Sequence, residues 1–279
     1  MEQKILILGA KGMLGHALSE AFVDKNPILW DSADLDITDQ KAVDQKLTEL
    51  KPTLIINAAA YTNVDGAETQ KELANLVNGQ AVGYLAKTAK KLGAILIHYS
   101  TDYVFDGEKQ AGYREDDIPN PISAYGQSKS LGEKLLQQEG EMYYLIRSAW
   151  MFGEFGQKNF IKSILTKAAK DGSLKVVNDK FGCPTYAKDL ASRTRKLVDD
   201  LKPCGIYHIT NATPKGGISW YDLAKKAIEL KCLKVKITSV ASEQTLDIAP
   251  RPKYSVLINT KLEPLRSWEE ALAEYLAIN

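Results

Sequence analysis

Residues 4–15 decide the fold of this protein, and they read KILILGAKGMLG. Residues 4–8 form a short apolar run typical of a buried strand, and helical spacing of apolar residues begins at residue 13. Between them stand Gly9, Gly12 and Gly15, in the pattern G-x-x-G-x-x-G. The first glycine permits a tight turn, the second lets the backbone approach a pyrophosphate, and the third lets the helix pack closely on the strand. The turn therefore predicts a dinucleotide site, because the free N–H groups at a helix N-terminus attract phosphate.

The chain beyond this turn alternates between short apolar runs and longer amphipathic stretches. Strands that are apolar throughout are expected where both faces of a sheet are covered, and strand–helix alternation indicates parallel strands with right-handed crossovers. We therefore expect an α/β fold with a Rossmann-like, doubly wound parallel sheet, built from residues 1–149 and parts of 186–212. Further strands are predicted at residues 27–30, 53–57, 94–100 and 143–147, and helices at 13–24, 41–50, 71–92 and 123–138.

After residue 149 the alternation loosens. Helical patterns at residues 159–170, 187–200 and 221–230 are separated by irregular stretches that contain prolines. No Gly/Ser-rich linker, repeat or low-complexity tract sets this half apart. We therefore expect residues 150–279 to form mainly a smaller, substrate-binding lobe packed on the carboxyl edge of the sheet.

The composition of the chain excludes several classes of function. Its 279 residues carry 36 Lys and Arg against 35 Asp and Glu, so the net charge is +1 and gives no reason to expect nucleic acid or an acidic membrane as the partner. The early apolar run is too short for a signal peptide or a membrane span. The three cysteines and three histidines show no metal-ligand spacing. We therefore expect a cytoplasmic protein without a metal site.

An acidic residue is expected at the end of the second strand of a dinucleotide fold, about 20 residues after the glycine turn. Asp31 stands there. Its carboxylate would accept hydrogen bonds from ribose hydroxyls and repel a 2′-phosphate, which favours NADH, although Lys11 offers a cation for the phosphate of NADPH. A solvated turn residue is the plain alternative for Asp31. The nearby carboxylates of residues 34, 36 and 39 are better explained by the N-terminus of the next helix than by a metal.

Hydroxyl groups follow the strand predicted at residues 94–100, where Thr101 should face the cleft at the carboxyl edge of the sheet. Further along, Tyr125 and Lys129 stand four residues apart on a predicted helix and therefore share one face. This spacing suits the reduction of a carbonyl, because the oxygen gains negative charge as hydride arrives and a proton must follow. The Lys129 ammonium, together with the charge of the nicotinamide, would bring the pKa of the Tyr125 phenol down from about 10, and the Thr101 hydroxyl can orient the carbonyl oxygen.

Longer strings of sequence resemble a known family. Together with the glycine turn and the Tyr125-x-x-x-Lys129 pair, they resemble the dTDP-4-dehydrorhamnose reductase family of the extended short-chain dehydrogenase/reductase superfamily. The resemblance runs in order from about residue 4 to about residue 270, and its most specific part is STDYVFDG. The strings are NAAAYTNVD (57–65), AE (67–68), STDYVFDG (100–107), RSAW (147–150), NF (159–160), GCPT (182–185), SW (219–220) and RPKYS (251–255).

The resemblance implies a reaction in which NADPH or NADH delivers hydride to the C4 carbonyl of dTDP-4-dehydro-L-rhamnose and Tyr125 protonates the oxygen. The catalytic residues would be Thr101, Tyr125 and Lys129. The cofactor would contact Gly9, Gly12, Met13, Leu14, Gly15, Asp31, Asp36, Ala58, Ala59, Ala60, Tyr61 and Lys129. The sugar nucleotide would contact Thr101, Asp102, Val104, Tyr125, Trp150, Asn159, Thr185 and Arg251.

Some of these implied roles have plain structural alternatives. The Arg251 guanidinium suits a pyrophosphate because its planar fork binds two oxygens, but a surface ion pair would use it as well. Trp150 would lie beside the sugar, or serve only to pack the core. The sequence also departs from the family pattern, with Lys11 in place of the usual Asn of the glycine turn, Lys180 in place of a common Gln, and Ala149 in place of a small hydroxylated residue.

Two rival interpretations stay open. One is another sugar-nucleotide reductase or epimerase of the same superfamily; a dehydratase is disfavoured because Tyr103 follows Asp102 where an Asp-Glu pair would stand. The other is a non-catalytic subunit resembling the regulatory subunit of methionine adenosyltransferase. The complete set of Thr101, Tyr125 and Lys129 favours an enzyme. The expected partner is a small sugar nucleotide, and a homodimer is compatible with the sequence.

Overall fold

The central sheet has six strands, all parallel, in the order β10-β5-β4-β3-β1-β2. The structure, a computed structural model, describes residues 3–156, 159–244 and 248–278. The chain reverses its direction of travel across the sheet between β1 and β3, and ligands of such sheets bind outside the carboxyl ends of the strands at that point. The doubly wound parallel sheet expected from the sequence is confirmed. The strands are β1 (Ile5–Leu8), β2 (Ile28–Trp30), β3 (Leu54–Asn57), β4 (Ile95–Thr101), β5 (Tyr143–Ser148) and β10 (Gly205–His208).

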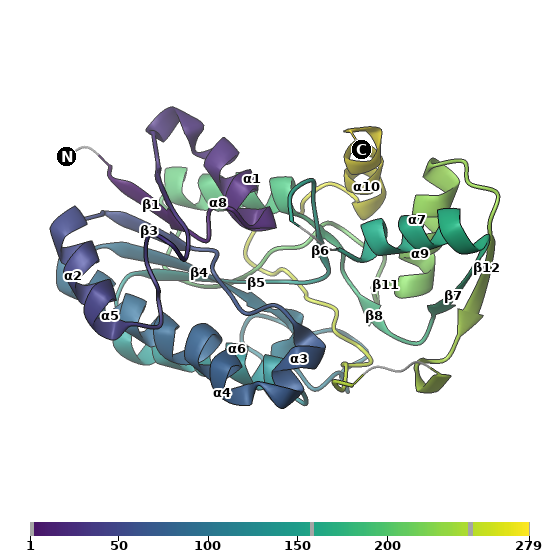
Figure 1. Cartoon of the computed structure of the whole chain (residues 1–279), viewed down its shortest axis with the longest axis horizontal. Coiled ribbons are helices and arrows are strands. Elements are labelled where there is room, and N and C mark those ends of the chain that lie inside the picture. Colours follow the sequence, from purple (N-terminus) through teal and green to yellow (C-terminus); the bar gives the residue numbers. More distant parts are fainter. Residues whose placement is uncertain (1–2, 157–158, 245–247, 279) are drawn as a thin grey trace.

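Helices cover both faces of this sheet (Figure 1). Alternate residues of β1 show the division: Ile5 and Ile7 pack with α1 and α8, whereas Leu6 and Leu8 pack on the opposite face with α2 and α5. The four inner strands β1, β3, β4 and β5 are therefore buried on both sides, which explains why their sequences are apolar without alternation. The helices are α1 (Met13–Ala21) and α8 (Ala187–Asp199) on one face, and α2 (Gln40–Leu50), α5 (Ala81–Leu92) and α6 (Ala124–Glu139) on the other.

The helix predicted over residues 71–92 is interrupted by one wide turn. It begins as α4 (Lys71–Asn75), passes through a π turn at Leu76–Gln80, and continues as α5. A short helix that the sequence did not predict, α3 (Val64–Thr69), precedes it. Single π turns inside α-helices are frequent at functional sites, and this one lies against α6.

The second half of the chain forms short strand pairs and helices beside the carboxyl edge of the sheet (Figure 1). β8 pairs with β11, β7 with β12 and β6 with β9, and two apolar clusters fill the space between the helices α7, α9 and α10. The elements are β6 (Met151–Phe152), α7 (Phe160–Asp171), β7 (Ser173–Val177), β8 (Phe181–Gly182), β9 (Thr185–Tyr186), β11 (Ile218–Ser219), α9 (Trp220–Leu230), β12 (Lys236–Val240) and α10 (Trp268–Ile278).

An extended stretch, residues 249–260, which we call the connecting segment, joins the two halves. In the second half, Phe181 N donates to Lys253 O at 2.8 Å. In the first half, Tyr113 N donates to Val256 O at 2.8 Å, and Ile258 N donates to Tyr113 O at 2.7 Å. The segment therefore makes main-chain hydrogen bonds to both halves within a few residues.

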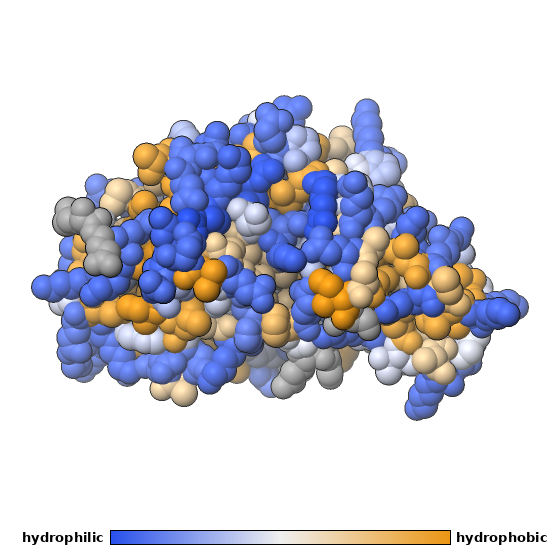
Figure 2. All heavy atoms as spheres, turned by 90° about the horizontal axis from the view of Figure 1, so that it is seen from above, coloured by the Kyte–Doolittle hydropathy of each residue, from blue (hydrophilic) through white to orange (hydrophobic). Residues whose placement is uncertain are grey.

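The surface is mostly polar. Figure 2 shows hydrophilic residues over much of one face, with apolar residues in small separate groups. Among the helices of the described residues, none has the length and apolar character that crossing a membrane requires. Within the same residues, no group of three or more His, Cys, Asp or Glu side chains could hold a metal ion.

Candidate active site

The glycine turn between β1 and α1 has the geometry that its sequence predicts. Gly9 has φ of +73°, and a Cβ there would lie 2.7 Å from Ala59 N. A Cβ on Gly15 would lie 2.1 Å from Gly9 O, so the third glycine allows α1 to approach the turn. Gly12 begins α1, and among the described residues no side chain caps this end and no acidic residue lies in its first turn. The free N–H groups of α1 therefore fit a bound pyrophosphate.

The second half of the chain lies over this turn. The Phe155 ring stacks on His16 of α1 with ring centroids 4.1 Å apart. Gly153 and Gly156 both lie against the Met13 side chain, close enough that an added Cβ would be 3.1–3.2 Å from it. The predicted cofactor contacts Met13 and Leu14 are thus half-buried and buried, respectively. A dinucleotide on this turn would be covered from one side by residues 153–156.

Asp31 and Asp36 follow β2 at the same edge of the sheet. The Asp31 carboxylate forms an ion pair with Lys11 of the glycine turn, and its Oδ1 accepts from Ala33 N at 2.8 Å. The Lys11 ammonium therefore lowers the pKa of Asp31. Asp36 points into its own turn, where its Oδ1 accepts from the backbone and the hydroxyl of Thr38 at 2.9 and 2.7 Å. Asp31 is accordingly placed beside the glycine turn, whereas Asp36 is engaged locally.

Residues 58–61 leave the carboxyl end of β3 next to the glycine turn, as predicted for the cofactor contacts Ala58, Ala59, Ala60 and Tyr61. Ala58 N donates to Leu8 O at 3.0 Å, and the buried Asn57 side chain accepts from Ala59 N at 3.2 Å. These two hydrogen bonds therefore hold the beginning of the loop in place.

The sequence analysis missed Asn78, which lies on the π turn and is 1% exposed. Its Oδ1 accepts from Tyr61 N, and its Nδ2 donates to Tyr61 O, each at 2.9 Å. The same Nδ2 donates to Ser128 Oγ of α6 at 3.0 Å, and that hydroxyl donates to Tyr125 O at 2.7 Å. One carboxamide thus joins the cofactor loop to the helix that carries Tyr125 and Lys129. The signal in the sequence that could have indicated Asn78 was a polar residue inside an otherwise amphipathic helix.

Thr101, Tyr125 and Lys129 converge at the carboxyl end of β4. Thr101 is the last residue of β4, and its hydroxyl donates to Asp102 Oδ1 at 2.9 Å. Tyr125 and Lys129 lie one turn apart on α6, which follows the Ser123 cap, and Thr101 lies near enough to the phenol to affect its pKa. The buried Lys129 ammonium donates to Tyr99 O at 2.6 Å. The three side chains predicted as catalytic are therefore brought together.

The protein's own groups set the protonation of this cluster. Burial raises the pKa of the Tyr125 phenol above its ordinary value, and the Asp102 carboxylate adds to the rise. Burial lowers the pKa of Lys129 to about 8, which Glu133, one turn along α6, opposes. Without the nicotinamide charge on which the expectation of a lowered pKa also rests, desolvation of the phenolate dominates the pKa of Tyr125. Tyr125 stands as a neutral phenol, the form that can donate a proton.

The other predicted substrate residues differ in their surroundings. Asp102 is buried beside Thr101, and burial raises the pKa of its carboxyl to about 6. Trp150 follows β5 with φ of +48°, and its half-buried ring stacks on Trp220 at 3.5 Å between centroids. Val104 and Thr185 are fully buried, so their side chains present no surface to a ligand in this structure.

Asn159 and Arg251 already have protein partners. Asn159 caps α7 by accepting from Lys162 N at 2.8 Å, and its amide donates to Gly153 O at 3.2 Å. Arg251, on the connecting segment, makes a two-pronged ion pair with Asp65 in the first turn of α3, with both N–O distances at 3.1 Å. An ion pair, the plain alternative for Arg251, is thus present, and a role at the diphosphate stays a prediction.

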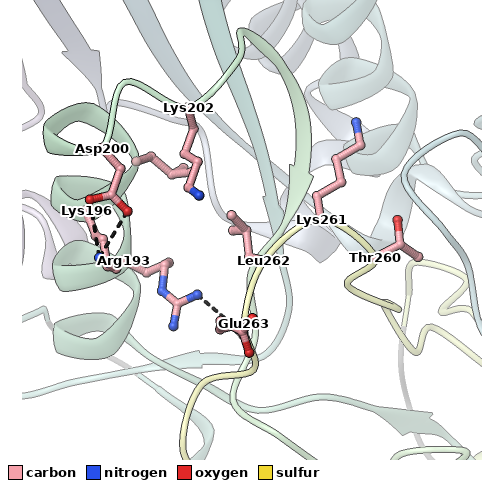
Figure 3. A pocket seen from close by; sticks show the side chains of 9 residues that line it. Arg193, Lys196, Asp200, Lys202, Thr260, Lys261, Leu262 and Glu263 are labelled. Atoms are coloured by element: carbon pink, nitrogen blue, oxygen red, sulfur yellow. Dashed lines mark hydrogen bonds and ion pairs between the residues drawn. The ribbon is translucent and has the colours of Figure 1, made fainter.

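A cavity of about 270 Å³ lies elsewhere, between α8 and residues 260–263 (Figure 3). It is lined by Arg193, Lys196 and Lys202 among other residues, and Arg193 Nη1 donates to Glu263 O at 2.5 Å. None of the predicted site residues lines it.

Comparisons with known proteins agree with this geometry along the whole chain. A family model described as the RmlD substrate binding domain matches residues 3–279. The spore coat polysaccharide biosynthesis protein SpsK of Bacillus subtilis (strain 168) is 38% identical, over 98% of this chain and 96% of its own length. The dTDP-4-dehydrorhamnose reductase of Aggregatibacter actinomycetemcomitans is 37% identical, over 96% of this chain and 97% of its own.

A solved structure shows the same arrangement in three dimensions. The dTDP-4-dehydrorhamnose reductase of Bacillus anthracis str. Ames, in complex with NADP, is 34% identical, covers 100% of both chains and has a TM-score of 0.95. The resemblance stated from the sequence is therefore confirmed. The protein belongs to the RmlD family, which includes the dTDP-4-dehydrorhamnose reductases.

Proposed function

We propose that this protein is an NAD(P)H-dependent reductase that converts dTDP-4-dehydro-L-rhamnose into dTDP-L-rhamnose. The observation that carries the proposal is the cluster of Thr101, Tyr125 and Lys129 at the carboxyl edge of the sheet, the same edge at which the N-terminus of α1 lies. Relatives that carry the reductase name match the chain over nearly its full length. A non-catalytic role is less well supported, because it would not account for the buried lysine and the neutral phenol at the strand end.

The residues of this chain divide the work. When bound, the nicotinamide supplies the hydride that reduces C4 of the sugar. The Tyr125 phenol donates its proton to the C4 oxygen, so that an O–H bond forms there as the phenolic O–H bond breaks. The Thr101 hydroxyl orients the carbonyl oxygen towards Tyr125. The Lys129 ammonium supplies a positive charge that stabilises the phenolate formed at Tyr125.

The second half of the chain would hold the rest of the sugar nucleotide. We assign residues 150–279 mainly to substrate binding and residues 1–149, with parts of 186–212, to the dinucleotide. The stacked pair of Trp150 and Trp220 supports this assignment, because its half-buried rings offer a flat apolar surface next to the carboxyl end of β5. The left-handed backbone of Trp150 costs energy that packing must offset, as is frequent at functional sites.

A different 4-keto sugar nucleotide is the second candidate substrate. A relative from Streptomyces niveus, 35% identical over 98% of this chain, is named dTDP-4-keto-6-deoxy-D-glucose reductase. The chemistry at C4 would be the same, so the two candidates differ only in the contacts to the sugar. We also propose a cytoplasmic location, which suits the free thiols of Cys183, Cys204 and Cys232. The homodimer stays a prediction.

The first test is turnover by the purified protein. dTDP-4-dehydro-L-rhamnose is generated in situ from dTDP-glucose with a dehydratase and an epimerase, and NADPH and NADH are supplied in parallel. We expect substrate-dependent loss of nicotinamide absorbance and formation of dTDP-L-rhamnose. Turnover that appears only with dTDP-4-keto-6-deoxy-D-glucose would favour the second candidate. Cofactor binding without turnover of either sugar would contradict the proposed function.

The Tyr125→Phe substitution tests the role of the phenol. It removes the proton donor without changing the ring, so kcat should fall by roughly 10²–10⁴-fold while the Kd of NADPH stays nearly unchanged. The matched control is Tyr84→Phe, since the Tyr84 hydroxyl contacts only Gln80 among the described hydrogen bonds and lies on α5. Full activity of Tyr125→Phe would refute the mechanism.

A further inference from the structure

A buried ion pair joins α6 to β5, one turn of α6 beyond Lys129. The Arg147 guanidinium of β5 donates to both carboxylate oxygens of Glu133 on α6, with Nε–Oε1 and Nη2–Oε2 distances of 2.9 and 2.7 Å. Each of the two side chains is 1% exposed. Replacing a buried ion pair with apolar residues of similar volume is often neutral or stabilising, so the stability of the fold does not by itself explain why two charges lie here.

The surroundings of Arg147 fix its guanidinium. Nη1 donates to Glu115 O at 3.3 Å, and Cζ lies over the Phe105 ring, 5.0 Å from its centroid. The same Nη1 lies 3.4 Å from His208 Nε2, and burial together with the Arg147 charge lowers the pKa of that histidine. His208 is therefore neutral at neutral pH, and Glu133 is the carboxylate that the guanidinium binds. Arg147 thus holds Glu133 in one orientation.

Glu133 and Lys129 share one face of α6, because they stand four residues apart on the helix. The Lys129 side chain is 3% exposed, and its ammonium donates to Tyr99 O, a neutral acceptor, at 2.6 Å. Burial lowers the pKa of Lys129 to about 8, and the Glu133 charge opposes this effect. A buried ammonium so close to its own pKa depends on a neighbouring negative charge to keep its proton.

The other titratable groups around Lys129 are neutral or act elsewhere. Tyr125, one turn earlier on α6, is a neutral phenol. On β4, burial and the Lys129 charge lower the pKa of His98, so that this histidine is neutral as well. Asp102, just beyond the end of β4, raises the pKa of the Tyr125 phenol. Among these groups, Glu133 is the one that raises the pKa of Lys129.

We propose that Glu133 is a positioning residue of the reduction, whose carboxylate, held by Arg147, keeps the Lys129 side chain in its ammonium form. Only the ammonium can stabilise the phenolate that forms at Tyr125 as its proton leaves, so Glu133 acts on the reaction through Lys129. This inference rests on the proposed reductase function and deepens it, because it names the group that sets the upper limit of the pH range in which the reductase works.

The experiment follows the protonation of Lys129 by NMR, without sugar or cofactor. In protein labelled with carbon-13 at lysine Cε, the Lys129 signal should titrate near pH 8, and its absence in Lys129→Met assigns it. In Glu133→Gln the titration should move down by roughly one pH unit, because an opposite charge nearby is lost. In Glu133→Asp, which keeps the charge, it should stay within about half a pH unit of the parent. Glu139→Gln, exposed at the end of α6, is the matched control and should not move it.

A second variant covers the loss of stability in Glu133→Gln, which leaves the Arg147 charge buried without its carboxylate. The double variant Glu133→Gln with Arg147→Met removes both charges, and thermal unfolding of each variant confirms that it is folded. The Lys129 titration of the double variant should lie below that of the parent, but above that of Glu133→Gln, because no Arg147 charge remains to repel the ammonium. The alkaline limb of kcat/KM should move to lower pH in the same order.

Two outcomes would overturn the inference. One is a Lys129 titration in the double variant that equals that of the parent, which would show that the Glu133 charge does not reach Lys129. The other is an equal downward move in Glu133→Asp and Glu133→Gln, which would show that the geometry of the ion pair matters and its charge does not. Because the titration needs no substrate, a lowered titration of Lys129 in a protein without turnover would support the role of Glu133 and refute only the proposed function.

Discussion

At the scale of single residues, Asp102 carries an energetic cost beside the reaction centre. The carboxyl is 1% exposed, and burial raises its pKa from the ordinary 3.8 to about 6, against the opposing effects of Ser255 and Thr101. A carboxyl whose pKa is raised in the folded state destabilises the fold as the pH rises from about 4 to about 6, because the charged form must then be buried. The cost at neutral pH is on the order of 3 kcal/mol.

The Asp102→Asn variant should therefore be more stable than the parent at pH 7 and gain little at pH 4. Thermal unfolding across this pH range measures the difference. Asp106→Asn is a control for which the change in stability should have the opposite sign. The Tyr113 hydroxyl lowers the pKa of Asp106, so the contribution of this carboxylate to stability is present at neutral pH and is lost as the pH falls. A gain in stability for Asp102→Asn that does not depend on pH would contradict the interpretation.

At the scale of elements, local patterns predicted the glycine turn and five strands of the central sheet, but neither β10 nor the short strands of the second half. The Tyr125–Lys129 spacing predicted which two side chains share a face of α6. What could not be predicted depends on contacts far apart in the sequence. The π turn lies inside a stretch that was predicted as one continuous helix, and it packs against α6, whose residues lie far along the sequence. The stack of Trp150 on Trp220 joins residues 70 positions apart, and nothing local to either residue indicates it.

The contact between the π turn and α6 is tight enough to test. A Cβ on Gly132 of α6 would lie 2.1 Å from the backbone oxygen of Asn78, and neither main chain can move without shifting the helix. Gly132→Ala should cost about 1–3 kcal/mol and lower kcat, because α6 carries Tyr125 and Lys129. Unfolding in urea and turnover measure the two effects.

Gly83→Ala is the matched control on the facing helix. Its added Cβ would lie 3.2 Å from Leu135 Cβ, a much wider separation than the 2.1 Å at Gly132, and alanine favours the helix over glycine by about 1 kcal/mol. Its stability should stay within about 1 kcal/mol of the parent, with turnover unchanged. Equal losses in both variants would contradict the importance of the Gly132 contact.

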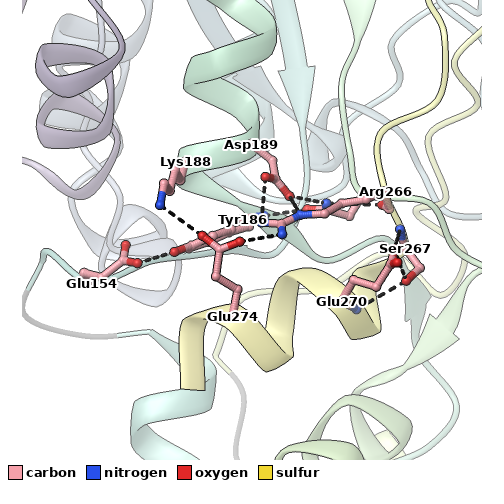
Figure 4. A network of polar contacts seen from close by, with 9 residues as sticks. Glu154, Tyr186, Lys188, Asp189, Arg266, Ser267, Glu270 and Glu274 are labelled. Carbon is pink, nitrogen blue, oxygen red and sulfur yellow. Dashed lines mark hydrogen bonds and ion pairs between the residues drawn. The ribbon is translucent and has the colours of Figure 1, made fainter. Parts of the chain in front are cut away.

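At the scale of the whole molecule, a polar network links α8 to α10 (Figure 4). The Arg266 guanidinium binds Asp189 through two N–O contacts of 2.8 and 2.9 Å and Glu274 at 2.5 Å, and Lys188 shares Glu274 at 3.0 Å. Arg266 thereby holds the last helix against a helix that packs on the central sheet. Networks of this kind contribute more than isolated surface pairs.

The Arg266→Met variant should unfold at a temperature roughly 2–4 °C lower for each kcal/mol lost. The Arg266 charge lowers the pKa of Glu274, so this part of the stability is present above the ordinary carboxyl range and disappears as the pH falls through it. The difference in unfolding temperature between the parent and Arg266→Met should therefore become smaller as the pH falls. Lys196→Met, which removes an exposed pair with Asp200, should leave the unfolding temperature unchanged. A comparable fall in the unfolding temperature of Lys196→Met would contradict a special role for the network.

The connecting segment also has a consequence for how the protein is made. Its hydrogen bonds to Tyr113 and Phe181 close the two halves around the strand ends, yet residues 249–260 are synthesised after every strand of the central sheet. A growing chain on the ribosome can thus assemble its sheet and glycine turn before the hydrogen bonds of the connecting segment form. These bonds between the two halves form only after residues 249–260 have been synthesised, and any shortened product that ends before residue 249 would display the sheet without the closed site.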